Sequence, residues 1–191
     1  MHRFLRSAHL AFGLFSSAYL FMYGWSAMQM SHNSWFDLKP AIEERTIPLG
    51  TQFAGNPRAT ARELMDRYGM TGQIMQSSVT DEGARLRINR PGAIHDVTYV
   101  NETGEARVRT SVATFPGVLN QVHHVHGLWH EWWPYQFAGA LVGAISVILI
   151  PLSLTGIYLW FKIHKERKVG AVLLGAQLVY GIAVILAIRG A

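Results

Sequence analysis

Histidines are the side chains of this sequence best suited to metal or haem chemistry, and the 191-residue chain has nine of them. A neutral imidazole binds haem iron, zinc and copper through one ring nitrogen. His123, His126 and His130 are spaced i, i+3 and i+7, so on a helix they would share one face and could chelate a transition-metal ion. The chain has no cysteine, which excludes disulfides, thiol redox centres and cysteine-ligated zinc. The histidines that could hold haem iron are His9, His32, His126, His130 and His164.

Three stretches without Asp, Glu, Lys or Arg would position these histidines in a membrane. Each stretch is at least as long as the ~20-residue helix that crosses the hydrocarbon core of a bilayer. The three predicted transmembrane helices lie within residues 1–30, 135–161 and 169–191. These lengths exclude a soluble single-domain protein. Small residues on the spans would let the helices pack closely, at Gly13, Gly139, Gly143 and Gly175.

The charge pattern predicts how the chain is oriented. The net charge is +5, yet residues 31–133 carry 10 Lys and Arg against 11 Asp and Glu, so the excess cations lie beside the predicted spans. They concentrate in residues 162–168 and at Arg3 and Arg6. Because cations beside spans favour the cytoplasm, we expect a cytoplasmic N-terminus, a basic cytoplasmic loop over 162–168, and residues 31–133 outside the cytoplasm. This distribution also speaks against nucleic acid as a partner.

The region between the first two predicted spans would form a separate module. Residues 31–57 contain several prolines and no sustained period, which predicts an extended linker. Over residues 58–117 the apolar period changes from helical to alternating, which predicts one helix followed by an antiparallel β-meander. At one turn of this meander, Gly104 is expected to take a positive φ. Residues 118–134, rich in His and Trp, would form an interfacial helix. The expected fold class is therefore three transmembrane α-helices with a small extracytoplasmic α+β module between spans one and two.

Three segments of the sequence resemble the PepSY-associated transmembrane family. They are Arg6-Ser-Ala-His-Leu-Ala-Phe-Gly13, then Val97-Thr-Tyr-Val-Asn-Glu-Thr-Gly-Glu105, and finally His126-Gly-Leu followed downstream by Leu154-Thr-Gly-Ile-Tyr-Leu-Trp-Phe-Lys162. The resemblance is to a short, three-span member. It implies a multi-pass protein of the bacterial inner membrane with an extracytoplasmic PepSY module. Some larger members of the family reduce ferric siderophores with b haems held by histidines.

If haem b is bound, the depth of each histidine limits which side chains could share an iron. Two axial imidazoles must approach one haem from opposite sides at the same depth. His9 and His164 lie near the predicted cytoplasmic ends of spans, whereas His32, His126 and His130 lie near the opposite ends. One pair would then form inside and one outside. The alternative interpretation is that the same side chains are packing or interfacial residues and hold no cofactor.

Three functions stay open at this point, one of which is metal sensing or uptake by the cluster of His123, His126 and His130. Of the other two, the first is a non-catalytic inner-membrane subunit that packs in or stabilises a larger membrane complex. Its contacts would be the lipid bilayer and either partner subunits or further copies of the chain. The second is a b-haem electron-transfer protein of the ferric-siderophore-reductase type. We expect the first, because the third predicted span has no histidine to serve as a haem ligand and three helices make a thin haem cage.

Overall fold

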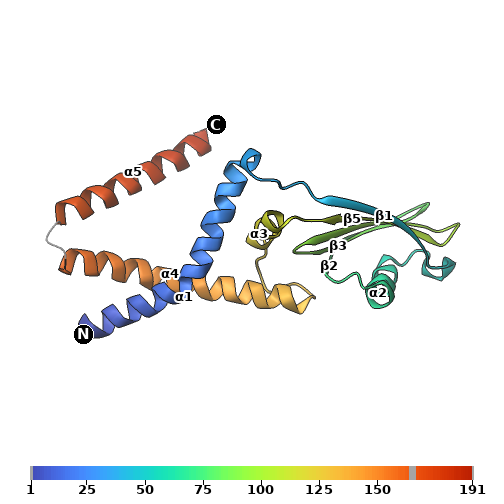
Figure 1. The fold of residues 1–191 in the computed structure, drawn as a ribbon, viewed down its shortest axis with the longest axis horizontal. Helices are drawn as coiled ribbons and strands as arrows, with labels where there is room; N and C mark the ends of the chain where they lie inside the picture. Colours follow the sequence, from blue (N-terminus) through green and yellow to red (C-terminus); the bar gives the residue numbers. More distant parts are fainter. Residues whose placement is uncertain (1, 164–166, 191) are drawn as a thin grey trace. The chain divides into compact units, whose positions relative to one another are not determined.

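The computed structural model of the protein describes residues 2–163 and 167–190. Within these residues the chain forms five α-helices, two short 3-10 helices and one five-stranded antiparallel sheet (Figure 1). The chain divides into two compact units. One consists of residues up to 18 and from 144 onward, and the other of residues 19–143. The sheet belongs entirely to the second unit.

The sheet has the strand order β1-β5-β4-β3-β2, and every neighbouring pair is antiparallel. Its strands are β1 (Ala41–Pro48), β2 (Gln73–Thr80), β3 (Gly83–Arg90), β4 (Ala93–Val100) and β5 (Glu105–Val112). The last four follow one another as the expected meander. β1 arises instead from the segment that the sequence predicts to be an extended linker, and it pairs with β5 along its whole length, from Ala41↔Val112 to Pro48↔Glu105. Ile47 is the only buried residue of this edge strand. The sequence of β1 therefore has no clear alternation of apolar and polar residues, which is the signal that predicts a strand.

Helix α2 (Pro57–Tyr68) covers one face of the sheet and closes the core of its unit (Figure 1). Its Ala61 and Leu64 are fully buried against sheet residues that include Ile88 and Tyr99. The helix begins after Asn56, whose side chain accepts a hydrogen bond from the amide of Ala59 at 3.1 Å, and it ends at a glycine with left-handed backbone. These two signals mark the beginning and the end of the helix in the sequence.

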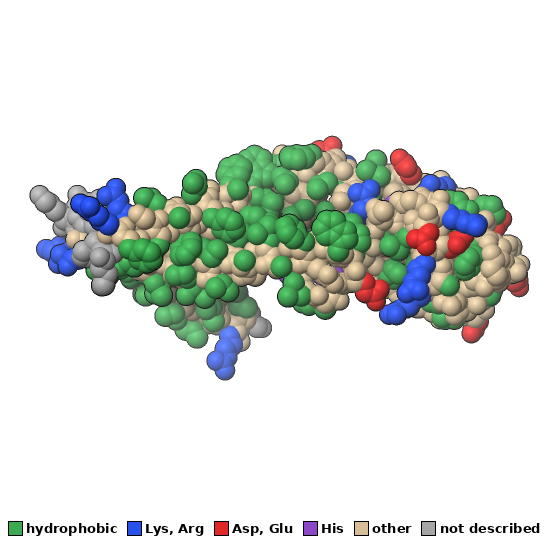
Figure 2. Space-filling view, turned by 90° about the horizontal axis from the view of Figure 1, so that it is seen from below, with side chains coloured by type: hydrophobic (Ala, Val, Ile, Leu, Met, Phe, Trp, Pro, Cys, Tyr) green, Lys and Arg blue, Asp and Glu red, His purple; other side chains and the backbone are tan. Residues whose placement is uncertain are grey.

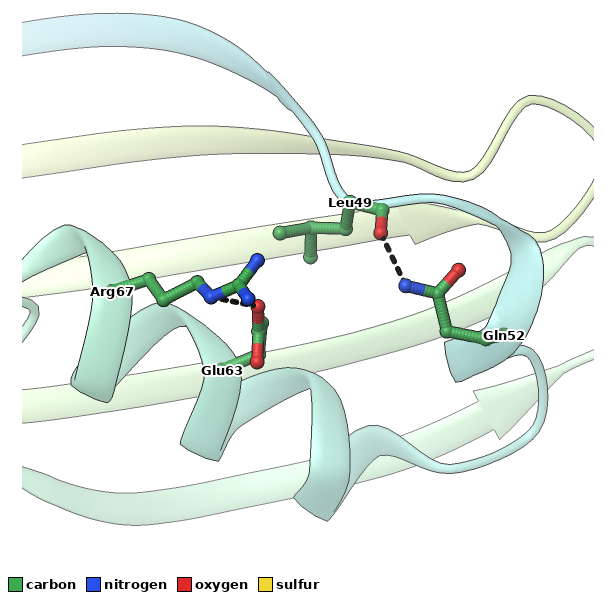
Figure 3. Close-up of polar contacts among 4 residues, drawn as sticks. All are labelled: Leu49, Gln52, Glu63 and Arg67. Atoms are coloured by element: carbon green, nitrogen blue, oxygen red, sulfur yellow. Dashed lines mark hydrogen bonds and ion pairs between the residues drawn. The ribbon is translucent and has the colours of Figure 1, made fainter.

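Polar contacts lie both in the loop before α2 and along α2 itself. Gln52, in the 3-10 helix η2 (Thr51–Phe53), donates a hydrogen bond to the carbonyl oxygen of Leu49 at 2.8 Å (Figure 3). Glu63 and Arg67 of α2 form an ion pair of 3.0 Å one turn apart (Figure 3). The ion pair lies on the surface of this unit, so it contributes little to the free energy of unfolding.

Gly104, in the turn between β4 and β5, has φ +66°, as the sequence predicts. Its carbonyl oxygen accepts hydrogen bonds from the amides of Leu49 and Gly50, at 2.9 and 3.0 Å. A Cβ at Gly104 would lie 2.5 Å from the carbonyl carbon of Gly50. The hydroxyl of Tyr99 donates to the carbonyl of Gly50 at 2.8 Å. The turn therefore joins the start of the module to its last hairpin, and only glycine fits there.

The other helices are α1 (His2–Ser31), α3 (Phe115–His123), α4 (Trp133–Ile163) and α5 (Arg167–Gly190), and a short 3-10 helix, η1 (Asn33–Trp35), follows α1. Two of them, α4 over Trp133–Lys162 and α5 over its full length, are long and apolar enough to cross a membrane. These two helices agree with the second and third predicted spans. Residues 164–166, which include His164, lie between these two helices in the chain and outside the described residues.

The expected fold class of three transmembrane helices with a small α+β module is wrong. Among the described residues only α4 and α5 qualify as spans, and one of the five strands, β1, lies outside the meander predicted within residues 58–117. Residues 8–30 of α1 lack charge, but ten of these 23 residues are glycines or carry polar or amphipathic side chains, which favour the hydrocarbon core less than Leu, Ile or Val do. They are His9, Gly13, Ser16, Ser17, Tyr19, Tyr23, Gly24, Trp25, Ser26 and Gln29. Freedom from charge is a weaker criterion than apolarity.

The predicted interfacial helix over residues 118–134 is also interrupted. Helix α3 ends at His123, and residues 124–132 form neither helix nor strand before α4 begins. Gly127 has φ +85°, which a right-handed helix cannot include. A Cβ on Gly139 of α4 would overlap the carbonyl oxygen of Gly127, so the loop backbone packs directly against this helix. The i, i+3, i+7 spacing of the histidines therefore does not place them on one helical face.

Candidate functional site

His9 of α1 contacts α4 inside the helical unit. Its Nδ1 lies 2.9 Å from the Oγ1 atom of Thr155. The Thr155 hydroxyl donates its single hydrogen to the carbonyl oxygen of Pro151 at 2.6 Å, with that of Leu152 at 3.1 Å. The hydroxyl therefore accepts from His9, and we assign the imidazole proton to Nδ1. This leaves Nε2 of His9 as the acceptor nitrogen.

Two glycines allow α1 and α4 to approach at this contact. A Cβ on Gly156 would lie 3.2 Å from Cε1 of His9, and one on Gly13 would lie 3.8 Å from a methyl carbon of Leu152. Gly13 was expected to serve helix packing, whereas Gly156 was not, although it follows Thr155 directly in the sequence. Gly143 and Gly175 have no neighbouring atom within 4 Å of such a Cβ, so among the described residues they line no close contact. Gly139, also expected to pack helices, instead accommodates the 124–132 loop.

His123, the last residue of α3, contacts the second half of α1 within the sheet-containing unit. Its Nδ1 is 2.7 Å from Oγ of Ser26, whose hydroxyl lies 3.0 Å from two carbonyl oxygens of its own helix. The ring centroid of His123 lies 4.5 Å from that of Tyr23. Burial, and secondarily the neighbouring His124, lower the pKa of His123 below its ordinary value of 6.5. This geometry is that of a neutral packing residue joining two helices.

The remaining histidines of the predicted sites are held by the backbone or by stacking. Nδ1 of His126 lies 2.7 Å from the carbonyl oxygen of His124, and Nε2 of His130 lies 3.0 Å from that of His126. Each of these ring nitrogens acts as a donor, because a carbonyl can only accept. His32 stacks on Trp35 with ring centroids 4.3 Å apart. In the described ranges no group of three His, Asp or Glu side chains is placed to hold a metal ion.

The sheet face opposite α2 is exposed and carries two rows of polar side chains that cross the strands. In the first row Glu44, Arg109, Asp96 and Arg87 are neighbours in register on β1, β5, β4 and β3. Arg87 and Asp96 form an ion pair of 2.6 Å, and Arg109 and Glu44 one of 3.6 Å. The charges of this row alternate in sign and pair with one another.

The second row lies two residues further along each strand and lacks carboxylates. It consists of Thr46, Arg107, Thr98 and Arg85, again neighbours in register on β1, β5, β4 and β3. All four side chains are exposed. Neither Arg85 nor Arg107 forms an ion pair with any residue in the described part of the chain. The two rows together place four arginines against two carboxylates.

Two shallow hollows lie on this face between the rows. One, of about 410 Å³, reaches Arg107 and Arg109, and the other, of about 270 Å³, reaches Arg85 and Arg87. Both are lined by Thr98 and by Asp96. Figure 2 shows acidic and basic side chains intermixed over the sheet-containing unit, whereas apolar side chains cover the long helices. We name the exposed face around Thr98, bounded by these four arginines, the arginine face.

Sequence reasoning missed the arginine face, although its signal is visible. Arginine alternates with buried apolar residues at Arg85-Leu-Arg87 and at Arg107-Val-Arg109. The alternation locates the strands and predicts that these side chains share one face. That they lie side by side depends on the register between β3, β4 and β5, which this alternation does not contain.

Comparisons with family models, with curated proteins and with solved structures found no match to this chain.

Proposed function

We propose that this chain is a non-catalytic, membrane-anchored subunit whose sheet binds a partner protein through the arginine face. The observation that carries this proposal is the contrast between the two faces of the sheet. One face is buried beneath α2, while the other exposes two in-register rows of polar and charged side chains. Exposed, hydrogen-bonding side chains on a rigid sheet form a surface that can recognise a partner without performing chemistry.

The anchor consists of α4 and α5 in a bacterial inner membrane. Lys162, at the end of α4, and Arg167 and Lys168, at the start of α5, form a basic segment on the cytoplasmic side. The sheet precedes the opposite end of α4 in the chain, so it lies outside the cytoplasm. The resemblance of residues 97–105 to a PepSY hairpin supports the same location. A glycine of positive φ closes that hairpin at Gly104.

Site-specific photo-cross-linking in living cells tests this proposal. A photoreactive amino acid replaces Thr98 on the arginine face or, as the matched control, Arg62 on the solvent side of α2; both positions are exposed. We expect a discrete cross-linked partner, identified by mass spectrometry, from position 98 and none from position 62. Equal cross-linking from both positions, or none from position 98, would contradict the proposal.

A second candidate, b-haem electron transfer, is favoured by one observation. Histidines that bind metals usually donate their other ring N–H to a fixed acceptor, and His9 does so to Thr155 at 2.9 Å, which makes Nε2 the nitrogen with a lone pair. His9 would be an axial ligand, and haem would supply one-electron chemistry. The proposed inner partner, His164, lies outside the described residues. Reduced-minus-oxidised absorption spectra of the wild type and of His9→Ala test this candidate: a b-type spectrum that His9→Ala diminishes would support it, and the absence of haem after expression with ample haem would contradict it.

A further inference from the structure

We propose that the arginine face binds an extended acidic segment of its partner, with Arg85 and Arg107 each holding one carboxylate on either side of Thr98. This inference rests on the proposed function, because it names the chemistry of the partner at the same face. The ligand class is a protein segment that carries two Asp or Glu side chains.

Arg85 and Arg107 differ from the other arginines of this face in having no partner of opposite charge in the described part of the chain. Arg87 and Arg109 are instead paired with Asp96 and Glu44. Because the first-row arginines already have a carboxylate beside them, the two arginines of the second row are the ones available to an incoming carboxylate. A guanidinium binds a carboxylate through two parallel hydrogen bonds, which makes arginine well suited to this role.

The register determines the separation of the two arginines. Arg107 lies opposite Thr98 on β4, and Thr98 lies opposite Arg85 on β3, so two strand spacings separate the arginine Cα atoms. Two spacings amount to about 10 Å. In a segment of polyproline II conformation, which has three residues per turn, residues three positions apart lie on one face and are separated by about 9 Å. The expected ligand therefore has acidic residues at positions i and i+3.

The surface between the arginines has the room and the polarity to receive such a segment. The two hollows meet at Thr98, so a segment that crosses β5, β4 and β3 there would lie along both of them. The Thr98 side chain is exposed and offers a hydroxyl to the backbone of the segment. Asp96 and Glu44 in the parallel row would repel carboxylates placed there, which keeps the acidic side chains on the Thr98 row.

The same two carboxylates argue against an anionic membrane surface as the ligand. A plane of lipid phosphates would meet Glu44 and Asp96 together with the arginines, because all of them project from one face. A narrow segment along the Thr98 row can place its carboxylates on Arg85 and Arg107, one row away from Glu44 and Asp96. We therefore assign the face to a protein segment and treat lipid binding as an outcome that would overturn the assignment.

Peptide binding to the full chain in nanodiscs of phosphatidylcholine tests this chemistry. The probe is a fluorescent ten-residue Ser/Thr peptide with Glu at positions 4 and 7, and its control carries Gln at both positions. We expect the Glu peptide alone to bind, with affinity that falls as NaCl is raised, since exposed ion pairs are screened by salt. Arg85→Gln and Arg107→Gln should each weaken binding about threefold, and the double variant about tenfold.

Arg62→Gln on α2 is the matched control, because it removes the same charge from an exposed position of the same unit. It should leave the affinity unchanged. Equal weakening by Arg62→Gln would indicate general electrostatic attraction and overturn the inference. So would equal binding of the Gln and Glu peptides. Binding to phosphatidylglycerol vesicles that the double variant abolishes, without any peptide binding, would assign the face to lipid instead.

Photo-cross-linking from position 98 in the Arg85→Gln/Arg107→Gln background separates this inference from the proposed function. We expect the partner adduct seen in the wild-type background to be lost. An undiminished adduct would overturn the acidic-segment inference and leave the binding function intact. Absence of the adduct already in the wild-type background would overturn the proposed function itself. Unchanged circular dichroism of the double variant establishes that the sheet is folded.

Discussion

His95 is a titratable side chain inside the sheet, and only 7% of its surface is exposed. Its Nδ1 lies 2.9 Å from Oγ1 of Thr110, the residue opposite it on β5. Burial lowers the pKa of His95 below its ordinary value of 6.5, and the positive charges of Arg90 and Arg45 lower it further. The folded sheet therefore favours the neutral form of the imidazole.

This burial makes the stability of the sheet depend on pH. Because the folded pKa is lower than the unfolded one, the unfolded chain binds more protons between the two values, and stability decreases as pH falls below about 6.5. Hydrogen exchange of β4 and β5, corrected for the intrinsic rate, should show protection declining from pH 7.5 to pH 5.5. In His95→Gln that decline should be smaller. The exposed His124→Gln should keep the wild-type profile, and an unchanged profile in His95→Gln would contradict the prediction.

Gly104 and Gly55 allow two contributions to the free energy of unfolding to be separated, namely the cost of left-handed backbone and the cost of a steric clash. Their φ values are +66° and +72°, but a Cβ at Gly104 meets the backbone of Gly50, whereas one at Gly55 has no atom within 4 Å. Gly55→Ala should destabilise the sheet-containing unit by about 1 kcal/mol, the cost of left-handed backbone alone. Gly104→Ala should cost at least about 2 kcal/mol, because the clash adds to it. Hydrogen exchange of β4 and β5 measures both, and equal losses would mean that the turn does not pack on Gly50.

At the scale of the elements, the sequence predicts the features that depend on local signals. It does not predict those that depend on contacts between distant segments. Helix α2 is marked by Asn56, Pro57 and Gly69, and all three act locally. The 124–132 loop is different, because the reason for the break lies in the contact of Gly127 with Gly139, twelve residues later. The same limit applies to the arginine face, whose rows depend on strand register. It also applies to His9, whose hydrogen-bond partner is 146 residues away.

The contact between the loop and α4 predicts opposite behaviour for two glycines one turn apart. Gly139→Ala places a methyl group against the carbonyl of Gly127 and should displace the 124–132 loop, with faster hydrogen exchange and proteolysis there. Gly143→Ala meets no atom within 4 Å and should be neutral or slightly stabilising, because alanine favours helix by about 1 kcal/mol. If both variants leave the loop equally protected, the close approach of loop and helix is refuted.

For the whole molecule, the sequence predicts the existence of membrane helices more reliably than their number. The uncharged stretches that became α4 and α5 are dominated by Leu, Ile, Val and Ala, whereas α1 mixes apolar residues with Ser, Gly, Tyr and Gln. Both types of stretch lack charge, and only hydropathy separates them. Side chains such as Ser26 and Gln29, which are fully buried, contact α3 within the sheet-containing unit. Such contacts cannot be read from composition.

The orientation of the molecule is directly testable, since a chain without cysteine gives no background to thiol labelling. A single cysteine at Thr103, in the exposed β4–β5 turn, should react with a membrane-impermeant maleimide in intact cells. A single cysteine at Lys168 should react only after the inner membrane is permeabilised, because the cations near it favour the cytoplasm. The reverse pattern would place the sheet in the cytoplasm and remove the basis for an extracytoplasmic partner.

The position of β1 determines when this strand can pair during synthesis of the chain. β1 is made first among the strands, yet its only neighbour, β5, is made last. At 5–20 residues per second, the ribosome needs about 3 to 13 s to pass from residue 48 to residue 112. During this interval β1 has no partner, and its Glu43, Glu44 and Arg45 disfavour pairing with other nascent chains. A nascent chain stalled before β5 would therefore hold β1 and the β4 edge unpaired at the same time, as a substrate for chaperones or proteases.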